Sequence, residues 1–457
     1  MSNKKTLEKI AAAPAVALED AVIELSKLEK LIISKRPLRH AEDYWATLGP
    51  GLTTGASDDD PSGIATYSQA GSQFGFKFLW LAPYTFPLMA VIQEMCARIG
   101  LVTGQGLAAN IRTHYAKWVL YLAAILLFCA NTFNIGADLG ALAQATRLLA
   151  PDLSVPLLVI GFALLSLLLQ IFTTYARYAK YLKYLSLVLF AYVFSAMYSH
   201  LNWGVVLQNT FLPDLKLHWS EFLLICGVFG TTISPYLFFW QSSQEVEEEI
   251  NKGRLSIKRR QLAASKSAIK KMRIDVWTGM AFSNMAMFFI IAACAGTLFA
   301  HGITNIGTAA DAAAALRPIA GDMAYLLFAV GIIGVGILAI PVLAGSASYA
   351  IAESFGWKFG LYRKLKQAYA FYGIIILSML VGLLLNFVGL DPIKALIYAA
   401  VANGLVAPVI LILIVRLSGN KKVMGKHVSG GWSKIIGWMT VGLMVAAGAG
   451  AIIALFL

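Results

Sequence analysis

The sequence predicts an all-α polytopic membrane protein with about eleven transmembrane helices. Three observations lead to this fold class. Of the 457 residues, 58% are hydrophobic and 13% are charged, whereas soluble domains carry about 25% charged residues. The hydrophobic residues gather in long runs, and the basic residues gather in alternate loops between those runs. Lipid therefore has to cover much of the apolar surface, because one soluble core could not bury it.

The apolar runs give the positions of the expected helices. A helix needs about 20 apolar residues to cross the bilayer. Eleven runs reach roughly this length, at 48–72, 78–101, 117–147, 154–175, 181–201, 220–242, 274–300, 322–353, 368–388, 392–416 and 432–456. All are expected to be helical, because lipid offers no hydrogen-bond partner to backbone N–H and C=O groups.

Basic residues predict which side each loop faces. One set of loops holds clusters of Lys and Arg within 112–117, 177–183, 252–273, 358–366 and 421–434, and the alternate loops hold single basic residues. Basic loops stay in the cytoplasm, so the N-terminus is expected there, and an odd number of helices places the C-terminus outside. The formal net charge of +13 then reflects topology in the cytoplasmic membrane. We therefore expect the protein to contact membrane lipid and not nucleic acid.

The first 47 residues differ from the rest of the chain. Between Val16 and Ile32, apolar residues are interleaved with charged ones, a pattern typical of an amphipathic helix on a membrane or protein surface. A compact apolar core and a cleavage site, which mark a signal peptide, are not visible. We expect a cytoplasmic N-terminal segment over 1–47 and a transmembrane domain over 48–457. An inert leader is the alternative for the first segment.

The reactive residue types do not form an enzyme-like constellation. All four cysteines lie inside apolar runs without metal-like spacing, and the six histidines lie near or outside the ends of those runs. Neither a zinc site nor a nucleophile–base pair is visible. The sequence therefore predicts no enzyme and no resident cofactor.

The first apolar run is interrupted by charge. Asp58, Asp59 and Asp60 stand in a row, followed by Pro61 and by Gly63. Each carboxylate near the bilayer centre costs about 2.5–3.5 kcal/mol on insertion scales, so these residues should not face lipid. Proline removes a backbone donor and glycine permits unusual angles. We expect the helix to break here and to expose carbonyls beside Asp60, an arrangement suited to a cation. The alternative is a loop outside the membrane that ends a shorter helix.

The sixth run is interrupted in the same way. Thr231, Ser234, Pro235 and Tyr236 stand inside it. Broken helices at matching positions of two halves predict an inverted-repeat transporter with an ion site at the midplane. Repeat one would span about 48–201, repeat two about 220–416, and an extra helix about 432–456.

The third run carries a polar stripe. Asn131, Asn134 and Asp138 are spaced by three and four residues, which places them on one helix face. The stripe should face the protein interior. A role in ion passage and simple hydrogen bonding between helices are both open at this point.

Both broken runs resemble the Nramp (natural resistance-associated macrophage protein) family of metal-ion transporters. Its members carry Gly-Pro-Gly, eight residues and Asp-Pro-Gly-Asn in the first helix, and Met-Pro-His in the sixth. This chain has Gly49-Pro50-Gly51, eight residues and Asp60-Pro61-Ser62-Gly63, then Ser234-Pro235-Tyr236. The resemblance implies a five-plus-five inverted repeat (LeuT-like), with discontinuous helices 1 and 6 and one extra helix.

The departures from the family pattern concern the site itself. By position, the resemblance implies that Asp60 keeps its role as metal ligand. Gly63 replaces an asparagine ligand, Ser234 replaces the methionine, and Thr231 stands at a carbonyl ligand. Tyr236 replaces a proton-linked histidine, and Asn131 and Ala141 replace acidic residues of the proton route. This pattern is similar to that of the Nramp-related magnesium branch.

The residue types at the site weigh on the substrate. Losing a thioether and gaining Ser62, Thr231 and Ser234 leaves oxygen ligands, which favour magnesium or manganese over soft metals. Asp58 and Asp59 could bind outer waters of the ion or attract it. Hydroxyls and half-helix N-termini also bind anions, so sodium held by Asp60 beside bicarbonate is the alternative. A membrane-embedded enzyme or sensor has less support. A small inorganic ion is the expected partner, and no oligomer is implied.

Overall fold

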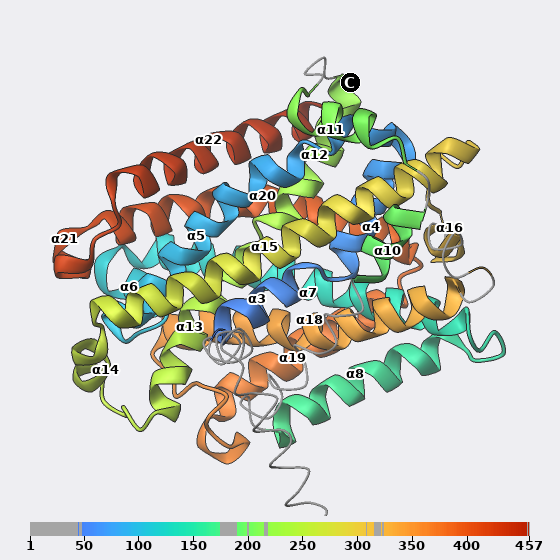
Figure 1. Cartoon of the computed structure of the whole chain (residues 1–457). Helices are drawn as coiled ribbons and strands as arrows, with labels where there is room; N and C mark the ends of the chain where they lie inside the picture. Colours follow the sequence, from blue (N-terminus) through green and yellow to red (C-terminus); the bar gives the residue numbers. More distant parts are fainter. Residues whose placement is uncertain are drawn as a thin grey trace, which may run out of the picture. The chain divides into compact units, whose positions relative to one another are not determined.

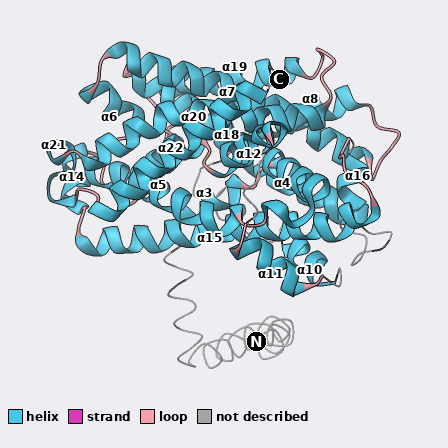
Figure 2. Cartoon of the chain, turned by 90° about the horizontal axis from the view of Figure 1, so that it is seen from above, coloured by secondary structure: helices cyan, strands magenta, loops and turns pink. Residues whose placement is uncertain are grey.

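In the computed structural model, the chain divides into two units, Met1–Gly49 and Pro50–Leu457 (Figure 1). The structure describes residues 44, 48–173, 190–198, 201–213, 218–307, 309–314, 321, 324–454 and 456. The predicted amphipathic segment therefore lies outside the described residues, apart from Tyr44. The fold reported below is that of the second unit, whose described residues contain helices, turns and no strands (Figure 2).

The long helices follow the predicted runs in order. They are α3 (Pro50–Asp58) with α4 (Pro61–Phe74), α5 (Leu81–Thr103), α7 (Lys117–Arg147), α8 (Val155–Phe172), α10 (Phe190–Tyr198), α12 (Trp219–Thr232) with α13 (Pro235–Asn251), α15 (Lys266–Thr297), α18 (Ala324–Phe355), α19 (Tyr369–Leu385), α20 (Pro392–Gly419) and α22 (Gly431–Ala454). Residues 181–189 and 199–200 of the fifth run lie outside the described residues.

Length and composition support the predicted number of spans. Among the described residues, eight helices are long and apolar enough to cross a membrane, with α12 and α13 taken as one, and α19 is a shorter apolar helix. The broken pair α3–α4 and the partly described α10 complete the eleven. Two helices exceed the predicted runs by more than two turns, because α13 continues to Asn251 and α15 starts at Lys266. Their added turns are polar, so the apolar runs could not include them.

Short helices that the apolar pattern did not predict connect the spans. They are α6 (Leu107–His114), α11 (Trp203–Phe211), α14 (Ile257–Ala263), α16 (Ala309–Ala314) and α21 (Lys421–Met424), with 3-10 turns η1 (Gly75–Phe78), η3 (Phe299–His301), η5 (Leu365–Gln367) and η6 (Gly425–His427). They are too short for hydrophobic periodicity to reveal them.

The two predicted breaks are present. Asp60 is the N-cap of α4 and Pro61 its first residue, and Ser234 and Pro235 hold the same places in α13. Proline is tolerated at this position because the first helical N–H groups have no partner within the helix. The alternative of a loop outside the membrane is wrong, because α4 runs on for 14 residues and Asp58, Asp59 and Asp60 are buried.

The first half-helix is held against α15 by glycines and by one carboxylate. A Cβ atom on Gly279 would lie 2.1 Å from the backbone oxygen of Gly51, and one on Gly55 would lie 2.2 Å from that of Gly279. The Asp275 carboxylate accepts the backbone N–H groups of Gly51 (2.7 Å) and Leu52 (3.0 Å). It therefore caps the N-terminus of α3.

Gly279→Ala should therefore destabilise the protein. The added methyl group meets backbone and not a flexible side chain, so two helices must separate, at a cost of about 1–3 kcal/mol. Thermal unfolding of the purified protein should show a lowered midpoint. Gly161→Ala in α8 is the matched control, because its Cβ would meet nothing within 4 Å. Equal midpoints for the two variants would contradict this account of the crossing.

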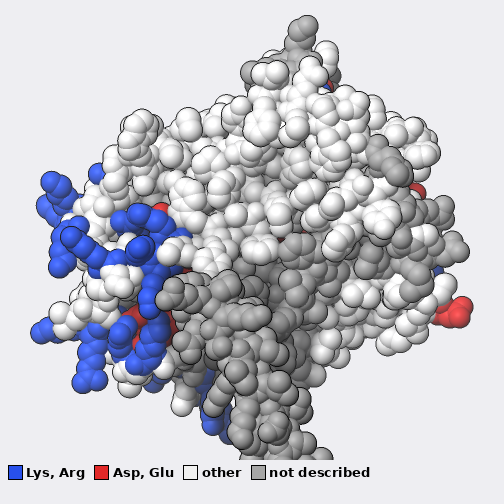
Figure 3. Space-filling view, in the orientation of Figure 1, with Lys and Arg blue, Asp and Glu red and all other residues white. Residues whose placement is uncertain are grey.

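The charged residues mark the two ends of the bundle. Lys and Arg gather at the end where α6, α14 and α21 lie (Figure 3). Near this end, Glu94 of α5 accepts hydrogen bonds from Arg98, from Arg273 (2.9 Å) and from Trp277 Nε1 (2.9 Å), which joins α5 to α15. At the other end, Lys77 pairs with Glu221 at 2.7 Å, which joins η1 to α12.

Candidate functional site

Asp60 lies at the break of the first span, with 1% of its surface exposed. Its Oδ1 accepts hydrogen bonds from Ser62 Oγ (2.5 Å) and from the backbone N–H of Gly63 (2.8 Å). Its Oδ2 accepts one from Asn134 Nδ2 of α7 (2.9 Å). A carboxylate offers about four lone-pair sites, so this one is oriented by three donors and keeps room for a further partner.

The two helix breaks face each other. A Cβ atom on Gly63 would lie 2.9 Å from Thr231 Oγ1 and 3.5 Å from the backbone oxygen of Asp58. The Tyr236 hydroxyl donates to the backbone oxygen of Ser57 at 2.7 Å. The end of α3 and the start of α4 therefore lie directly against the break between α12 and α13.

Two hydroxyls from the second break differ in their bonding. Ser234 Oγ donates toward the backbone oxygens of Gly230 (2.8 Å) and Thr231 (2.6 Å). It therefore satisfies the last turn of α12, and its lone pairs stay available. Thr231 Oγ1 is buried and makes no hydrogen bond to the residues that the structure describes. An ion bound between the two breaks would give this hydroxyl a partner.

Asp58 and Asp59 turn toward α15. Ser283 Oγ of that helix contacts Asp58 Oδ2 and lies 3.3 Å from Asp59 Oδ1. The other oxygens, Asp58 Oδ1 and Asp59 Oδ2, have no hydrogen-bond partner and are buried. The three consecutive aspartates therefore divide into Asp60, which is fully oriented, and a pair that shares a single hydroxyl.

The polar stripe of α7 divides as well. Asn134 reaches Asp60, whereas Asn131 Nδ2 donates to the Leu343 backbone oxygen (2.9 Å) and to Ser346 Oγ (2.7 Å) of α18. The geometry of Asn131 thus favours hydrogen bonding between helices over a place in the ion route. Asp138 is fully buried, and neither of its oxygens has a hydrogen-bond partner.

The structure adds polar groups that the apolar runs concealed. Gln244 and Glu245 lie three and four residues after Gln241, on the same face of α13, and all three are buried. Gln241 Oε1 and both amide atoms of Gln244 lack hydrogen-bond partners, as do both amide atoms of Gln93 on α5 and of Asn403 on α20. The spacing of Gln241, Gln244 and Glu245 was visible in the sequence and could have extended the sixth helix.

The side chains that could bind a metal ion at the two breaks offer oxygen atoms, which are hard ligands. Asp58, Asp59, Asp60 and Asp138 form no ion pair with Lys or Arg within the described parts of the chain. No group of three or more His, Cys, Asp and Glu side chains suited to a metal occurs there either. The sulfur of Met287 lies 3.7 Å from Thr232 Oγ1. Buried carboxylates without cationic partners are costly, so a cation or protons would stabilise this site.

Comparison with known sequences identifies relatives of this chain. Residues 51–454 match the family model of natural resistance-associated macrophage protein-like (Nramp) proteins. The chain is 24% identical over 405 residues to the divalent metal cation transporter MntH of Klebsiella pneumoniae, covering 88% of this chain and 92% of that one. The resemblance of the two broken helices therefore extends over most of the sequence.

Solved structures show the same fold. The Eremococcus coleocola manganese transporter, in complex with an aromatic bis-isothiourea substituted compound, matches with a TM-score of 0.72 at 17% identity, over 90% of this chain and 86% of that one. Mhp1, a nucleobase-cation-symport-1 family transporter, matches with a TM-score of 0.55 at 18% identity, over 90% and 91%. These likenesses confirm the predicted fold class of a polytopic helical protein with discontinuous first and sixth helices.

Proposed function

The chain belongs to the Nramp family, whose members are transporters and not enzymes, and on this premise we propose which ion it carries. It imports a hard divalent cation, magnesium or manganese, across the cytoplasmic membrane by alternating access. It does so without the proton coupling that its resemblance would imply. Asp60 binds the ion, with Ser62, Gly63, Thr231, Ser234 and Tyr236 around it.

The single observation that carries this proposal is the set of oxygen ligands at the two helix breaks. The side-chain ligands there are the Asp60 carboxylate and hydroxyls, and Thr231 Oγ1 is buried without a hydrogen-bond partner among the described residues. Magnesium prefers few carboxylates and keeps several of its waters. A site with one oriented carboxylate and nearby hydroxyls suits such an ion better than it suits a soft metal.

The family name alone does not select the ion. The similar Klebsiella protein is named for divalent metal cations, and the similar Eremococcus structure for manganese. At 17–24% identity, these names do not establish the ion for this chain, so the choice between the ions rests on the residues at the site. Here the methionine position is Ser234, which removes the ligand that would favour softer metals.

A sodium-coupled symporter of a small anion such as bicarbonate is the second candidate. One observation favours it: Ser234 makes no side-chain cap on α13, so the N–H groups of that helix start could meet an anion. The four buried aspartates oppose it, because they would repel an anion unless sodium or protons neutralised them. We therefore rank the cation first.

Topology and organisation complete the proposal. The basic end of the bundle would face the cytoplasm with the N-terminus, and the C-terminus would lie outside. The repeats would span about 48–201 and 220–416, followed by an extra helix over about 432–456. The clustering of Lys and Arg in Figure 3 supports this orientation.

Uptake into proteoliposomes tests the proposal directly. The purified full chain would be offered magnesium, manganese and, in separate vesicles, bicarbonate with and without sodium. We expect uptake of a divalent cation that saturates and needs no sodium. Bicarbonate uptake that requires sodium, with no divalent flux, would establish the second candidate instead.

Ser234→Met should increase sensitivity to cadmium. The substitution places a thioether sulfur, a soft ligand, where Ser234 now bonds to the last turn of α12. In the metal-uptake assay we expect inhibition at about tenfold lower cadmium concentration, equivalent to about 1.4 kcal/mol. Ser378→Met in α19 is a control, because Ser378 is buried and bonds only its own helix at Ile375. A folded, active Ser234→Met variant without added cadmium sensitivity would count against the metal and for the anion.

A further inference from the structure

The connection between α13 and α15 is fixed to the end of α5. Arg260 of α14 donates from Nε to the backbone oxygen of Gly104 (2.9 Å), and Gln261 donates to that of Thr103 (3.1 Å). Thr103 is the last residue of α5, a membrane-spanning helix. The connection therefore lies beside the end of this span, on the side of the bundle where the basic residues gather.

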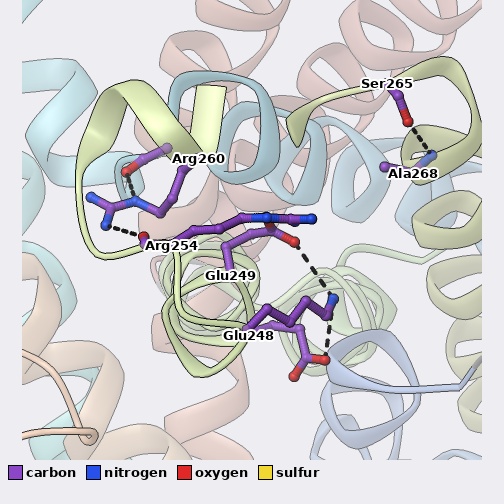
Figure 4. Close-up of polar contacts among 8 residues, drawn as sticks. Glu248, Glu249, Arg254, Arg260, Ser265 and Ala268 are labelled. Carbon is purple, nitrogen blue, oxygen red and sulfur yellow. Dashed lines mark hydrogen bonds and ion pairs between the residues drawn. The ribbon is translucent and has the colours of Figure 1, made fainter. Parts of the chain in front are cut away.

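Arg260 is the residue that holds this connection in shape. It is 7% exposed, and its Nη1 also donates to the backbone oxygens of Arg254 (3.2 Å) and Leu255 (2.8 Å). Figure 4 shows its guanidinium directed at the turn before α14. Burial lowers the pKa of this side chain. Arg260 has a structural role, because its N–H groups donate to backbone carbonyls. The neighbouring cations Lys258 and Arg259 are exposed.

The same connection exposes large apolar side chains. Leu255, Ile257 and Leu262 are 72%, 42% and 77% exposed. Lys258 and Arg259 lie between them and are exposed as well. Apolar side chains interleaved with Lys and Arg beside the end of a span are typical of a segment that lies in the membrane interface.

The cations of this connection form two groups, those paired with a glutamate and those without an ion pair in the described part of the chain. Lys252 pairs with Glu248 at 3.3 Å, and Arg254 pairs with Glu249 (Figure 4). The second group makes no ion pair within the described part of the chain; it consists of Lys258, Arg259, Lys266, Lys270 and Lys271. The second group therefore forms a positive surface over α14 and the first turns of α15.

A histidine lies beside this surface, and cations near it lower the pKa of its side chain. His427 of η6 interacts with the backbone at Ala264, which lies between α14 and α15. Burial lowers the pKa of His427, and the cations Lys426, Arg98 and Lys266 lower it further.

We propose that this surface, Leu255–Lys271, binds anionic phospholipid headgroups of the adjacent leaflet. Lys258, Arg259, Lys266 and Lys270 would contact the lipid phosphates, and Leu255, Ile257 and Leu262 would enter the acyl boundary. A soluble polyanion would use the cations but not the exposed leucines, so lipid fits both features. Binding would attach the ends of α5, α13 and α15 to the leaflet. This inference rests on the membrane orientation given under the proposed function, and it does not depend on which ion is transported.

Photo-crosslinking in vesicles tests the lipid surface. The full chain would be reconstituted with photoactivatable phosphatidylglycerol or phosphatidylcholine at equal mole fraction, and labelled peptides would be mapped. We expect peptides within 255–271 to react about fivefold more with the anionic lipid. Equal labelling by both lipids would overturn the proposal. So would loss of the labelling when inorganic polyphosphate is added, since a soluble polyanion would then be the preferred occupant.

A charge-matched pair of variants assigns the effect to this surface. The variant Lys258→Gln, Arg259→Gln, Lys266→Gln, Lys270→Gln should reduce labelling by the anionic lipid to the level of phosphatidylcholine. The control replaces four exposed lysines of other connections by glutamine: Lys364, Lys366, Lys421 and Lys422. The control should keep the fivefold preference within 255–271. An equal loss in both would show that only net charge matters and would reject the site. Since labelling requires no uptake, its failure would leave the proposed transport untouched.

Discussion

Asp60→Asn should abolish transport while the protein still folds. The substitution keeps the size of the side chain, and asparagine is as good an N-cap as aspartate. The new amide can still accept the N–H of Gly63. Its nitrogen would meet Asn134, whose own Oδ1 has no partner and could accept after a flip of that amide. The local structure therefore survives, and only the negative charge at the break is lost.

The expected loss of uptake is about 100-fold or more, from removal of a charged ligand worth on the order of 3 kcal/mol. Initial rates in proteoliposomes, normalised to reconstituted protein, measure it. Asp391→Asn is a matched control, because Asp391 is also an N-cap followed by proline, at the start of α20, but is exposed. Uptake by Asp60→Asn at the rate of the unsubstituted protein would remove Asp60 from the site.

The sequence predicted those features of the fold that depend on local chemistry. Eleven runs of apolar residues and two Pro-containing interruptions were sufficient, because lipid imposes helix length and Pro61 and Pro235 impose the breaks. The polar ends of α13 and α15 were missed for the same reason. The added turns over residues 243–251 and 266–273 carry only scattered apolar residues among polar ones, so they do not extend an apolar run.

The site needed the tertiary structure. Asp60 could be chosen from its position at the break, but its bond to Asn134 joins residues 74 positions apart. The face of α7 shared by Asn131 and Asn134 did not reveal that one side chain reaches Asp60 while the other bonds to α18. Likewise, Ser283 is an isolated serine in an apolar run, and only packing places it between Asp58 and Asp59.

Transport should proceed without acidification of the vesicle lumen. Asn131 and Tyr236 stand where the resemblance expects proton-handling groups, and neither exchanges protons near neutral pH. Asn131 is bonded to α18, and the Tyr236 hydroxyl is engaged by the Ser57 carbonyl. Asp138 is the one carboxylic acid on α7. Neither of its oxygens has a hydrogen-bond partner among the described residues.

A pH-sensitive dye trapped in proteoliposomes measures this prediction. With magnesium or manganese supplied outside, we expect metal uptake and a constant lumenal pH, both in the unsubstituted protein and in Asp138→Asn. Acidification that follows the metal dose and disappears in Asp138→Asn would show that Asp138 carries protons, and the prediction would be wrong. The same dye separates the two substrates: bicarbonate entering with sodium would make the lumen more alkaline, and only when sodium is present. Because Asp138 is fully buried, the variant also needs a check of its thermal unfolding before its trace is compared.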